Sequence, residues 1–329
     1  MVRGRSIAIT ALALVGAAAA CLMPSLSQLS GGGDGGASVG DSGGDAIVAT
    51  DAAKPDASPE PGCDPKKPFA APTAVGGLNL AGYSSSSARL TEDQLTVYFN
   101  AEWPGGAGKQ DLFVAKRATT ADAFGTPTRL TSLNSTAQDW DPTITTDDLT
   151  LYFGSTRVTP ENIFFSTRKL PTDPFPPPAP VPGINGDAGG QEAFVLGNSR
   201  VLYFASRRQG ADAGTDIYRA EGNGAAFGAP VSVANVNGTA SEQLPVVTDD
   251  ELLMVLGSNR SGGAGGVDIY LSRRTSTAIP FDVPINVTEL NSPTDDYPSW
   301  ISSDGCHVLM LSDRADSVHM MIYESRRPL

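Results

Sequence analysis

Residues 139–168 decide the fold, and they read Asp-Trp-Asp-Pro-Thr-Ile-Thr-Thr-Asp-Asp-Leu-Thr-Leu-Tyr-Phe-Gly-Ser-Thr-Arg, a short loop, then Asn-Ile-Phe-Phe-Ser-Thr-Arg. The run Leu-Thr-Leu-Tyr-Phe at 149–153 is of strand length and is flanked by turn residues. Asp147-Asp148 suits a hairpin turn, because Asp tolerates the dihedral angles that tight turns require. The stretch therefore predicts short antiparallel strands joined by tight turns.

Three features of this stretch recur along the chain. The pair Ile163-Phe164 has counterparts at 112–113, 217–218, 269–270 and 322–323, at intervals of 51 to 54 residues. A Ser-x-Arg-type segment, as at 155–157, precedes the pair, and a Phe-x-x-Pro segment, as at 175–178, follows it. Repeats of about this length are typical of propellers and solenoids. Four predicted strands in each repeat favour a propeller blade.

The number of repeats predicts how the ring closes. Five units contain the Ile-Tyr-type pair, but a Phe-x-x-Pro segment follows only four of them. A matching segment, Phe69 to Pro72, lies upstream of the first unit. We therefore expect the N-terminal segment to supply the outermost strand of the last blade, which removes free sheet edges. The prediction is an all-β fold, a single propeller of five four-stranded blades, with six blades as the alternative.

The repeat resembles a known family. The pattern Pro-x-Ile-Thr-x-Asp-Asp-Leu-x-Leu-Tyr-Phe-x-Ser-x-Arg, followed by Asp-Ile-Tyr, is similar to the TolB-type, WD40-like propeller repeat of bacterial envelope proteins. The resemblance covers roughly residues 66–329, although Asn100-Ala101-Glu102 replaces Ser-x-Arg in the first unit. TolB itself resembles a six-bladed form, which is why six blades remain the alternative. Such propellers serve many roles, so the resemblance predicts fold more than function.

The N-terminus has the pattern of an export signal. Arg3 and Arg5 precede an apolar run at 7–20, which is too short to span a bilayer comfortably. Ala18-Ala19-Ala20-Cys21 resembles the lipobox of bacterial lipoproteins, which implies lipidation of Cys21. Ala18 stands where Leu is expected, so cleavage by ordinary signal peptidase is the alternative. Residues 1–21 are thus predicted to be a signal peptide, 22–65 a disordered tether, and 66–329 the propeller.

These segments also predict where the protein is located in the cell. The lipoprotein resemblance, with Leu22 after the cysteine, implies an outer-membrane anchor, with the propeller facing the periplasm or the cell surface. A soluble periplasmic or secreted protein is the alternative. We expect membrane contact only through the lipid, and a monomer. The formal net charge of −13 disfavours nucleic acid, because a phosphate backbone requires a basic surface.

The two remaining cysteines predict a disulfide. Cys63 lies six residues before Phe69, and Cys306 follows the Asp304-Gly305 turn of the fifth unit. Closure by the N-terminal strand would place both in one blade, and an oxidising envelope compartment permits the bond. The alternative is a buried Cys306 with Cys63 free in the tether.

Residues that recur in nearly every unit are interpreted as structural. A ligand contact does not need to be repeated five times, whereas turns and contacts between blades do. We therefore assign to turns and blade pairing the residues Asp111, Asp216, Asp268, Arg157, Arg207, Arg260 and Arg314, and to the core Tyr98, Tyr152 and Tyr203.

A ring of acidic residues is the candidate binding site. The first strand of each blade lines a propeller's channel, and carboxylates stand near the start of this strand in four of the units. The predicted rim consists of Asp139, Trp140, Asp141, Glu192, Glu242, Asp295 and Asp296. It would suit a cation or a basic peptide, with solvated turn residues as the alternative interpretation. No cofactor is predicted, and calcium has no motif to support it.

Three functions remain open. With two histidines and no CxxC or HExxH motif, His-based catalytic or metal sites are hard to assemble. We expect a non-catalytic, TolB-like envelope scaffold that binds a protein or peptide, and no enzyme. One alternative is a lectin, although Trp103, Trp140 and Trp300 share no register. The other is a glycan-active hydrolase, because five-bladed propellers host glycosidases that use two carboxylates.

Overall fold

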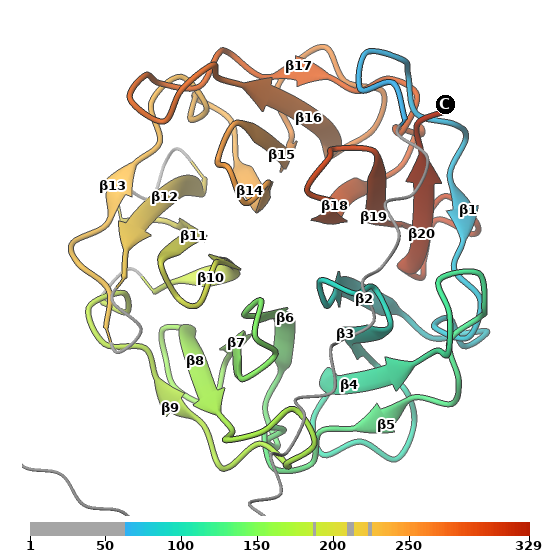
Figure 1. The fold of residues 1–329 in the computed structure, drawn as a ribbon, viewed down its shortest axis with the longest axis vertical. Coiled ribbons are helices and arrows are strands. Elements are labelled where there is room, and N and C mark those ends of the chain that lie inside the picture. The colour runs from blue at the N-terminus through green and yellow to red at the C-terminus, as the bar shows by residue number, and fades with distance from the viewer. Residues whose placement is uncertain (1–62, 187–188, 209–213, 223–225) are drawn as a thin grey trace, which may run out of the picture. The chain divides into compact units, whose positions relative to one another are not determined.

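Five antiparallel sheets form a closed ring (Figure 1). The computed structural model describes residues 63–186, 189–208, 214–222 and 226–329, and its regular elements there are all strands. Each sheet has four strands. The predicted all-β, five-bladed propeller is confirmed, and the six-bladed alternative is wrong. No helix in these ranges has the length and apolar character needed to cross a membrane.

The blades follow one another along the chain, each numbered from the channel outward. Blade 1 contains β2 (Ser85–Leu90), β3 (Thr96–Ala101), β4 (Asp111–Lys116) and β5 (Thr128–Arg129). Blade 2 contains β6 (Asp139–Ile144), β7 (Thr150–Ser155), β8 (Asn162–Thr167) and β9 (Ala179–Pro180). Blade 3 contains β10 (Gln191–Leu196), β11 (Val201–Ser206), β12 (Asp216–Glu221) and β13 (Val231–Ser232). Blade 4 contains β14 (Glu242–Val247), β15 (Leu253–Ser258), β16 (Asp268–Arg273) and β17 (Ile285–Asn286). Blade 5 contains β18 (Asp296–Ile301), β19 (His307–Ser312), β20 (Met321–Arg326) and β1 (Thr73–Ala74).

The two ends of the propeller meet in blade 5. Strand β1 pairs antiparallel with β20, Thr73 opposite Glu324, as the blue and dark red strands in Figure 1 show. Asn79 then clamps Ile322: its Oδ1 accepts from the Ile322 amide at 2.8 Å and its Nδ2 donates to the Ile322 carbonyl at 3.0 Å. The predicted closure by the N-terminal strand is therefore confirmed.

The same asparagine clamp is found in all five blades. An asparagine after the outermost strand bonds both backbone groups of the first residue of the Ile-Tyr-type pair in every blade. The clamps are Asn134 on Leu112, Asn185 on Ile163, Asn237 on Ile217, Asn291 on Ile269 and Asn79 on Ile322. The side-chain amide thus continues the hydrogen bonding of an outermost strand that is only two residues long.

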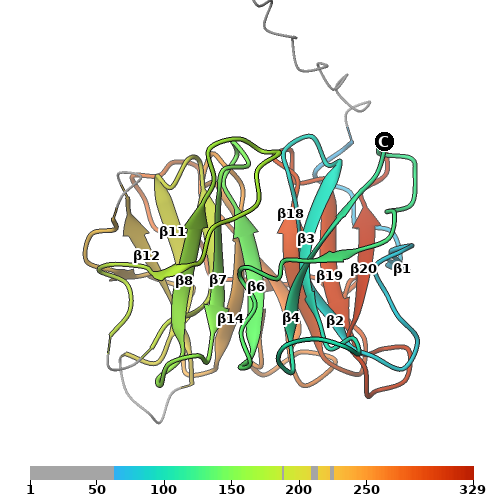
Figure 2. The same ribbon diagram turned by 90° about the horizontal axis from the view of Figure 1, so that it is seen from below.

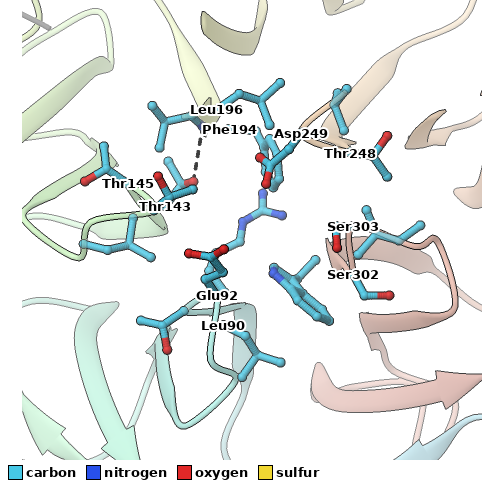
Figure 3. Close-up of a pocket in the computed structure, with 18 of the residues that line it drawn as sticks. Leu90, Glu92, Thr143, Thr145, Phe194, Leu196, Thr248, Asp249, Ser302 and Ser303 are labelled. Carbon is cyan, nitrogen blue, oxygen red and sulfur yellow. Dashed lines mark hydrogen bonds between the residues drawn. The ribbon is translucent and has the colours of Figure 1, made fainter. Parts of the chain in front are cut away.

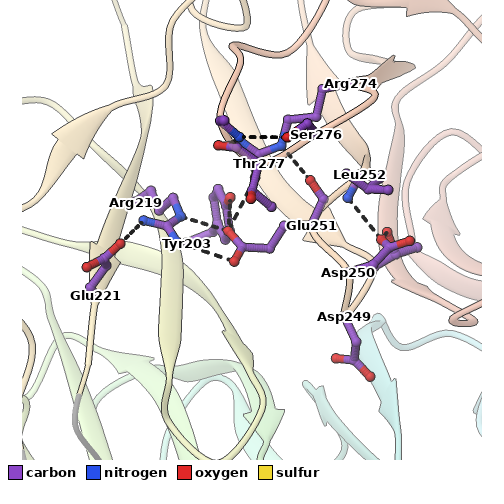
Figure 4. Close-up of polar contacts among 12 residues, drawn as sticks. Tyr203, Arg219, Glu221, Asp249, Asp250, Glu251, Leu252, Arg274, Ser276 and Thr277 are labelled. Carbon is purple, nitrogen blue, oxygen red and sulfur yellow. Dashed lines mark hydrogen bonds and ion pairs between the residues drawn. The ribbon is translucent and has the colours of Figure 1, made fainter.

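Packing between blades accounts for the apolar runs. Strands β3, β11, β15 and β19 are buried at every position, because both of their faces pack against neighbouring blades. Tyr98, Tyr152 and Tyr203 lie in this core, and each hydroxyl also reaches the hairpin turn of the next blade. The longest of these networks surrounds Glu251, which binds Tyr203 and the guanidinium groups of Arg219 and Arg274 (Figure 4).

A disulfide joins Cys63 to Cys306, with their Cα atoms 6.1 Å apart, as the sequence predicted. The bond ties the segment before β1 to the turn before β19, so it fixes the same closure that β1 makes. Crosslinks that close long loops restrict the unfolded chain most, and this one spans 243 residues.

We predict that the double variant Cys63→Ser/Cys306→Ser unfolds at lower urea concentration than the wild type, by about 2–5 kcal/mol in the free energy of unfolding. Urea denaturation followed by tryptophan fluorescence measures the difference. Adding reductant to the wild type should reproduce it, and adding reductant to the variant should change nothing. Equal midpoints for variant and wild type would show that strand pairing alone holds the ring.

Candidate functional site

The five inner strands, β2, β6, β10, β14 and β18, line the central channel (Figure 1). Each is irregular at one point, where its register against the second strand shifts. Figure 2 shows the long strands running from one face of the ring to the other, so strand starts gather at one mouth and strand ends at the other. The two mouths are lined by different residues and form separate cavities.

Four of the irregular points adopt a left-handed backbone. Ser87, Asp141, Glu192 and Leu244 have φ of 51°, 51°, 57° and 46°. Bulges re-aim side chains, and strained non-glycine residues cluster at functional sites. In β18 the corresponding residue is Pro298, whose ring forbids positive φ, and there the register shifts between Pro298 and Trp300 instead. The bulges bring the side chains of Asp141 and Glu192 to the same cavity.

That cavity lies at the mouth where the strands begin and has a volume of about 330 Å³. Asp141 and Glu192 line it together with the residues that precede the bulges. These preceding residues are Ser86, Trp140, Gln191, Gln243 and Tyr297. Gly154 in β7 makes room for the indole, because a Cβ there would lie 2.7 Å from Trp140 Nε1. The mouth thus combines two carboxylates, two aromatic rings and several amides.

Asp141 forms hydrogen bonds with polar neighbours, yet its pKa is raised above the usual value of an aspartate. Its side chain accepts a hydrogen bond from the Ser87 hydroxyl, and its amide donates to Asn100 Oδ1 at 3.1 Å. Burial raises the pKa of Asp141 to about 6, while the Ser87 hydrogen bond and the charge of Arg89 oppose the rise. The group is therefore ionised at neutral pH.

The pKa of Glu192 is raised further than that of Asp141. Burial, and then the negative charge of Asp141, raise the pKa of Glu192 to about 8. The Leu244 amide donates to its Oε2 at 2.8 Å, and Gln191 Nε2 donates to Oε1 at 3.2 Å, which limits the rise. The two carboxyl groups thus differ, because Glu192 holds its proton to a higher pH than Asp141 does.

Arg89 is the residue that the sequence analysis missed. It is 1% exposed and occupies an inner-strand position that holds Thr143, Phe194, Val246 and Trp300 in the other blades. Burial lowers its pKa to about 9, whereas the nearby Asp141 and Glu192 favour its charged form. An arginine in an otherwise small or apolar strand segment, Ser-Ala-Arg-Leu, was the available signal.

The structure brings only part of the predicted rim together. Trp140, Asp141 and Glu192 line the cavity as expected. Asp139, Glu242 and Asp296 are fully buried in ion pairs within their own blades, with Arg157, Arg260 and Arg314 respectively. Asp295 accepts a hydrogen bond from the Val267 amide at 2.9 Å, in a loop of the blade interface. The rim is therefore corrected to three of its seven residues.

The arginines of these ion pairs also link each blade to the preceding one. Arg157 Nη2 binds Asp139 at 2.6 Å and also donates to the Leu133 carbonyl of the preceding blade at 2.6 Å. Arg260 and Arg314 repeat this arrangement with Val236 and Leu290. In blade 3 the equivalent residue is Arg208, which reaches the Ile184 carbonyl at 2.7 Å, so the assignment of Arg207 was wrong. Arg208 is the arginine of the Ser-x-Arg segment at 206–208, and it donates to the Ser206 hydroxyl as Arg157 donates to that of Ser155.

The turn aspartates have the structural role that the repeats predicted. Asp111 accepts from the Ala107 amide and Asp268 from the Ala264 amide, both at 3.1 Å. Within the described ranges, the one close group of possible metal ligands is Cys63, Asp304 and Cys306, whose two thiols form the disulfide. Because both thiols are in the disulfide, this group cannot ligate a metal, and a cation at the acidic rim stays an untested hypothesis.

The second cavity, at the ends of the inner strands, has a volume of about 170 Å³. Its lining includes Arg89, Phe194 and Trp300, and its edge carries Glu92 and Asp249 (Figure 3). None of these residues belongs to the first cavity. Arg89 links the two cavities electrostatically, because the charges of Asp141 and Glu192 favour its charged form.

Solved structures resemble this propeller at low sequence identity. An α-L-arabinofuranosidase from Podospora anserina matches over 80% of this chain and 98% of its own chain, at 14% sequence identity and a TM-score of 0.50. An α-L-arabinofuranosidase from Lactobacillus brevis matches over 76% of this chain and 94% of its own chain, also at 14% sequence identity and a TM-score of 0.50. TolB from Acinetobacter baumannii matches at 13% identity and 0.43, over 75% of this chain and 55% of TolB.

The chain thus spans about half the length of that TolB. No protein-family profile matches the chain, and no curated protein matches its sequence. Identities this low establish the propeller fold and leave the chemistry to the residues themselves.

The expectation of a non-catalytic binding scaffold needs correction. It depended on the resemblance to TolB, but glycoside hydrolases are prominent among the structural neighbours and match this propeller over nearly their whole length. The prediction that the protein is not an enzyme is contradicted in the same way. The raised pKa values of Asp141 and Glu192 depend on burial that no sequence motif displays.

We predict that the free energy of unfolding falls as pH rises from about 5 to 8. The folded protein holds the Glu192 proton up to a pKa of about 8, whereas the unfolded chain releases it near 4.5, so deprotonation favours unfolding across this window. The slope should approach about 1.4 kcal/mol per pH unit. Urea unfolding of wild type and Glu192→Gln at pH 6, 7 and 8 tests this.

The variant should lose most of the slope, whereas Glu221→Gln, at a side chain that is 78% exposed, should keep it. Identical slopes for Glu192→Gln and wild type would contradict the raised pKa.

Proposed function

We propose that this protein is a glycan-active hydrolase whose active site is the cavity around Asp141 and Glu192. The observation that carries the proposal is a pair of carboxyl groups in one cavity with pKa values of about 6 and about 8. Two carboxyl groups whose environments separate their pKa values supply the acid and the base of glycoside hydrolysis.

The two residues take different roles. In this proposal Glu192, which has the higher pKa, acts as the general acid that donates its proton to the oxygen of the leaving sugar. Asp141, which has the lower pKa, activates water or attacks the sugar itself. The positive charge of Arg89 favours the ionised form of Asp141, so it maintains the difference between the two groups without contacting the cavity.

The rest of the cavity suits a carbohydrate. Trp140 and Tyr297 offer aromatic faces with polar edges, and such rings pack against the apolar faces of sugars. Gln138, Gln191 and Gln243 supply amide groups that both donate and accept hydrogen bonds, as sugar hydroxyls do. The volume of about 330 Å³ lies at the lower end of the range for ligand sites. A short stretch of glycan is therefore the expected substrate.

We predict hydrolysis of one or more members of a panel of aryl arabinofuranosides, xylosides, galactosides and glucosides. Glu192→Gln and Asp141→Asn should each lower kcat by about 10²- to 10⁴-fold, because each removes a proton-transferring group and keeps the shape. Release of the aryl group is the measurement, and Glu221→Gln is the control that should keep full activity. Hydrolysis that survives both substitutions would contradict this site.

Binding of glycans to wild type without any turnover would instead favour the lectin alternative. The pH profile of an active enzyme should rise as Asp141 ionises near 6 and fall as Glu192 loses its proton near 8.

We also propose that the propeller is exported and held at the outer membrane by lipid on Cys21, with residues 22–65 as the tether. The basic start, the apolar run and the small residues before Cys21 support this, and the disulfide fits an oxidising compartment. Residues 1–62 lie outside the described ranges, so the signal peptide and most of the tether are inferred from the sequence.

Mass spectrometry of the protein expressed in a bacterial host should show a diacylglyceryl group on Cys21 as the first residue. Cys21→Ala should remove the modification and release the propeller from the membrane fraction. A mature chain that begins at an unmodified Cys21 would favour the soluble alternative.

A further inference from the structure

The second mouth of the channel has a cavity of its own. This cavity, of about 170 Å³, is formed by the ends of the inner strands and shares no lining residue with the cavity of Asp141 and Glu192. The glycan proposal uses the charge of Arg89 but leaves its hydrogen-bond donors unmatched. It also gives no role to Glu92 and Asp249 at the edge of the cavity.

Arg89 presents an unsatisfied cation to this cavity. The side chain is 1% exposed, and its Nε, Nη1 and Nη2 atoms have no hydrogen-bond partner among the residues that the structure describes. The guanidinium lies 4.6 Å from the centre of the Phe194 ring, which is also part of the cavity wall. A buried guanidinium has five N–H donors, and leaving them unmatched is costly. A ligand carboxylate would satisfy two of them in a bidentate pair.

The edge of the cavity has the opposite charge. Glu92 and Asp249 are exposed side chains, and Figure 3 shows both carboxylates directed toward the space between the strands. They lie close enough that the charge of Glu92 adds to burial in raising the pKa of Asp249. Arg200, the neighbouring cation, donates to the Asp249 carbonyl and pairs with Glu251, so its charge is already engaged.

The charges select one kind of ligand. An anion alone would be attracted by Arg89 but repelled by the two carboxylates at the edge, and Asp141 behind Arg89 already offsets part of its charge. A cation alone would be attracted by the edge but repelled by Arg89. A molecule with a carboxylate at one end and an ammonium at the other matches both the guanidinium of Arg89 and the carboxylates of Glu92 and Asp249 at the edge.

We propose that this mouth binds a small zwitterion, an α-amino acid of about the size of alanine, with its carboxylate on Arg89 and its ammonium between Glu92 and Asp249. The size follows from the volume, since a cavity of about 150 Å³ holds benzene, which has about as many heavy atoms as alanine. Phe194 and Trp300 line the cavity and suit a short aliphatic side chain.

Isothermal titration calorimetry of the full chain with L-alanine, propionate and ethylamine tests the proposal. The three probes have similar size, and only alanine carries both charges. Alanine should bind at least tenfold more tightly than either of the others. Equal affinity for propionate would overturn the role of the edge carboxylates, and the absence of alanine binding would overturn the site.

Two variants separate the two ends of the ligand. Glu92→Gln/Asp249→Asn changes only exposed side chains and should weaken alanine binding at least tenfold, while propionate comes to bind as well as alanine. Arg89→Met should abolish binding of both. If Arg89→Met does not fold, the edge variant still decides, because unchanged alanine affinity there contradicts the proposal. Glu221→Gln is the control with wild-type affinity. The readout requires no hydrolysis, so failure here is distinct from failure of the hydrolase proposal.

Discussion

The pairing of β1 with β20 is the contact on which the rest of the molecule depends. Both cavities are lined by residues of blades 1 and 5, so neither exists until the ends of the ring meet. The pairing itself is short, with two residues opposite two. Asn79, which clamps Ile322, and the Cys63–Cys306 bond supply what such a short strand lacks. Closure thus combines local hydrogen bonds with one covalent restriction of the unfolded chain.

Closure creates a narrow channel, and the narrowness sets the electrostatics. Arg89, Asp141 and Glu192 are buried within it, so their charges interact: Asp141 and Glu192 favour the charged form of Arg89, Arg89 favours ionised Asp141, and Asp141 adds to burial in raising the pKa of Glu192. The arrangement divides the channel by charge: a carboxyl pair faces one mouth, and a guanidinium faces the other. Holding such groups together requires rigid strands. The buried ion pairs of Asp139, Glu242 and Asp296 hold each blade, and their arginines also bond carbonyl groups of the preceding blade.

Much of the fold could be predicted because each repeat carries its own structural instructions. The hairpin aspartates and the Ile-Tyr-type pairs recur at nearly constant intervals, so periodicity displays them. Four of the clamping asparagines likewise lie 20 or 22 residues from the residue that they clamp. Blade 3 shows the limit of this reasoning. Arg208 makes the contact to the preceding blade, as the Ser-x-Arg spacing at 206–208 requires. Gly190, however, stands where blades 2, 4 and 5 place a buried carboxylate, and the register of the strands was needed to reveal this.

The sequence by itself determined the number of blades, their strand order, the closure by the N-terminal segment and the disulfide, because repeated local pairings encode them. Only the tertiary structure decided which acidic residues face the channel. Simple alternation would place Asp139 and Asp141 on one face of β6, but the bulge at Asp141 breaks the alternation. Asp139 therefore turns into an ion pair, while Asp141 joins Glu192, whose protonation depends on burial between blades far apart in sequence.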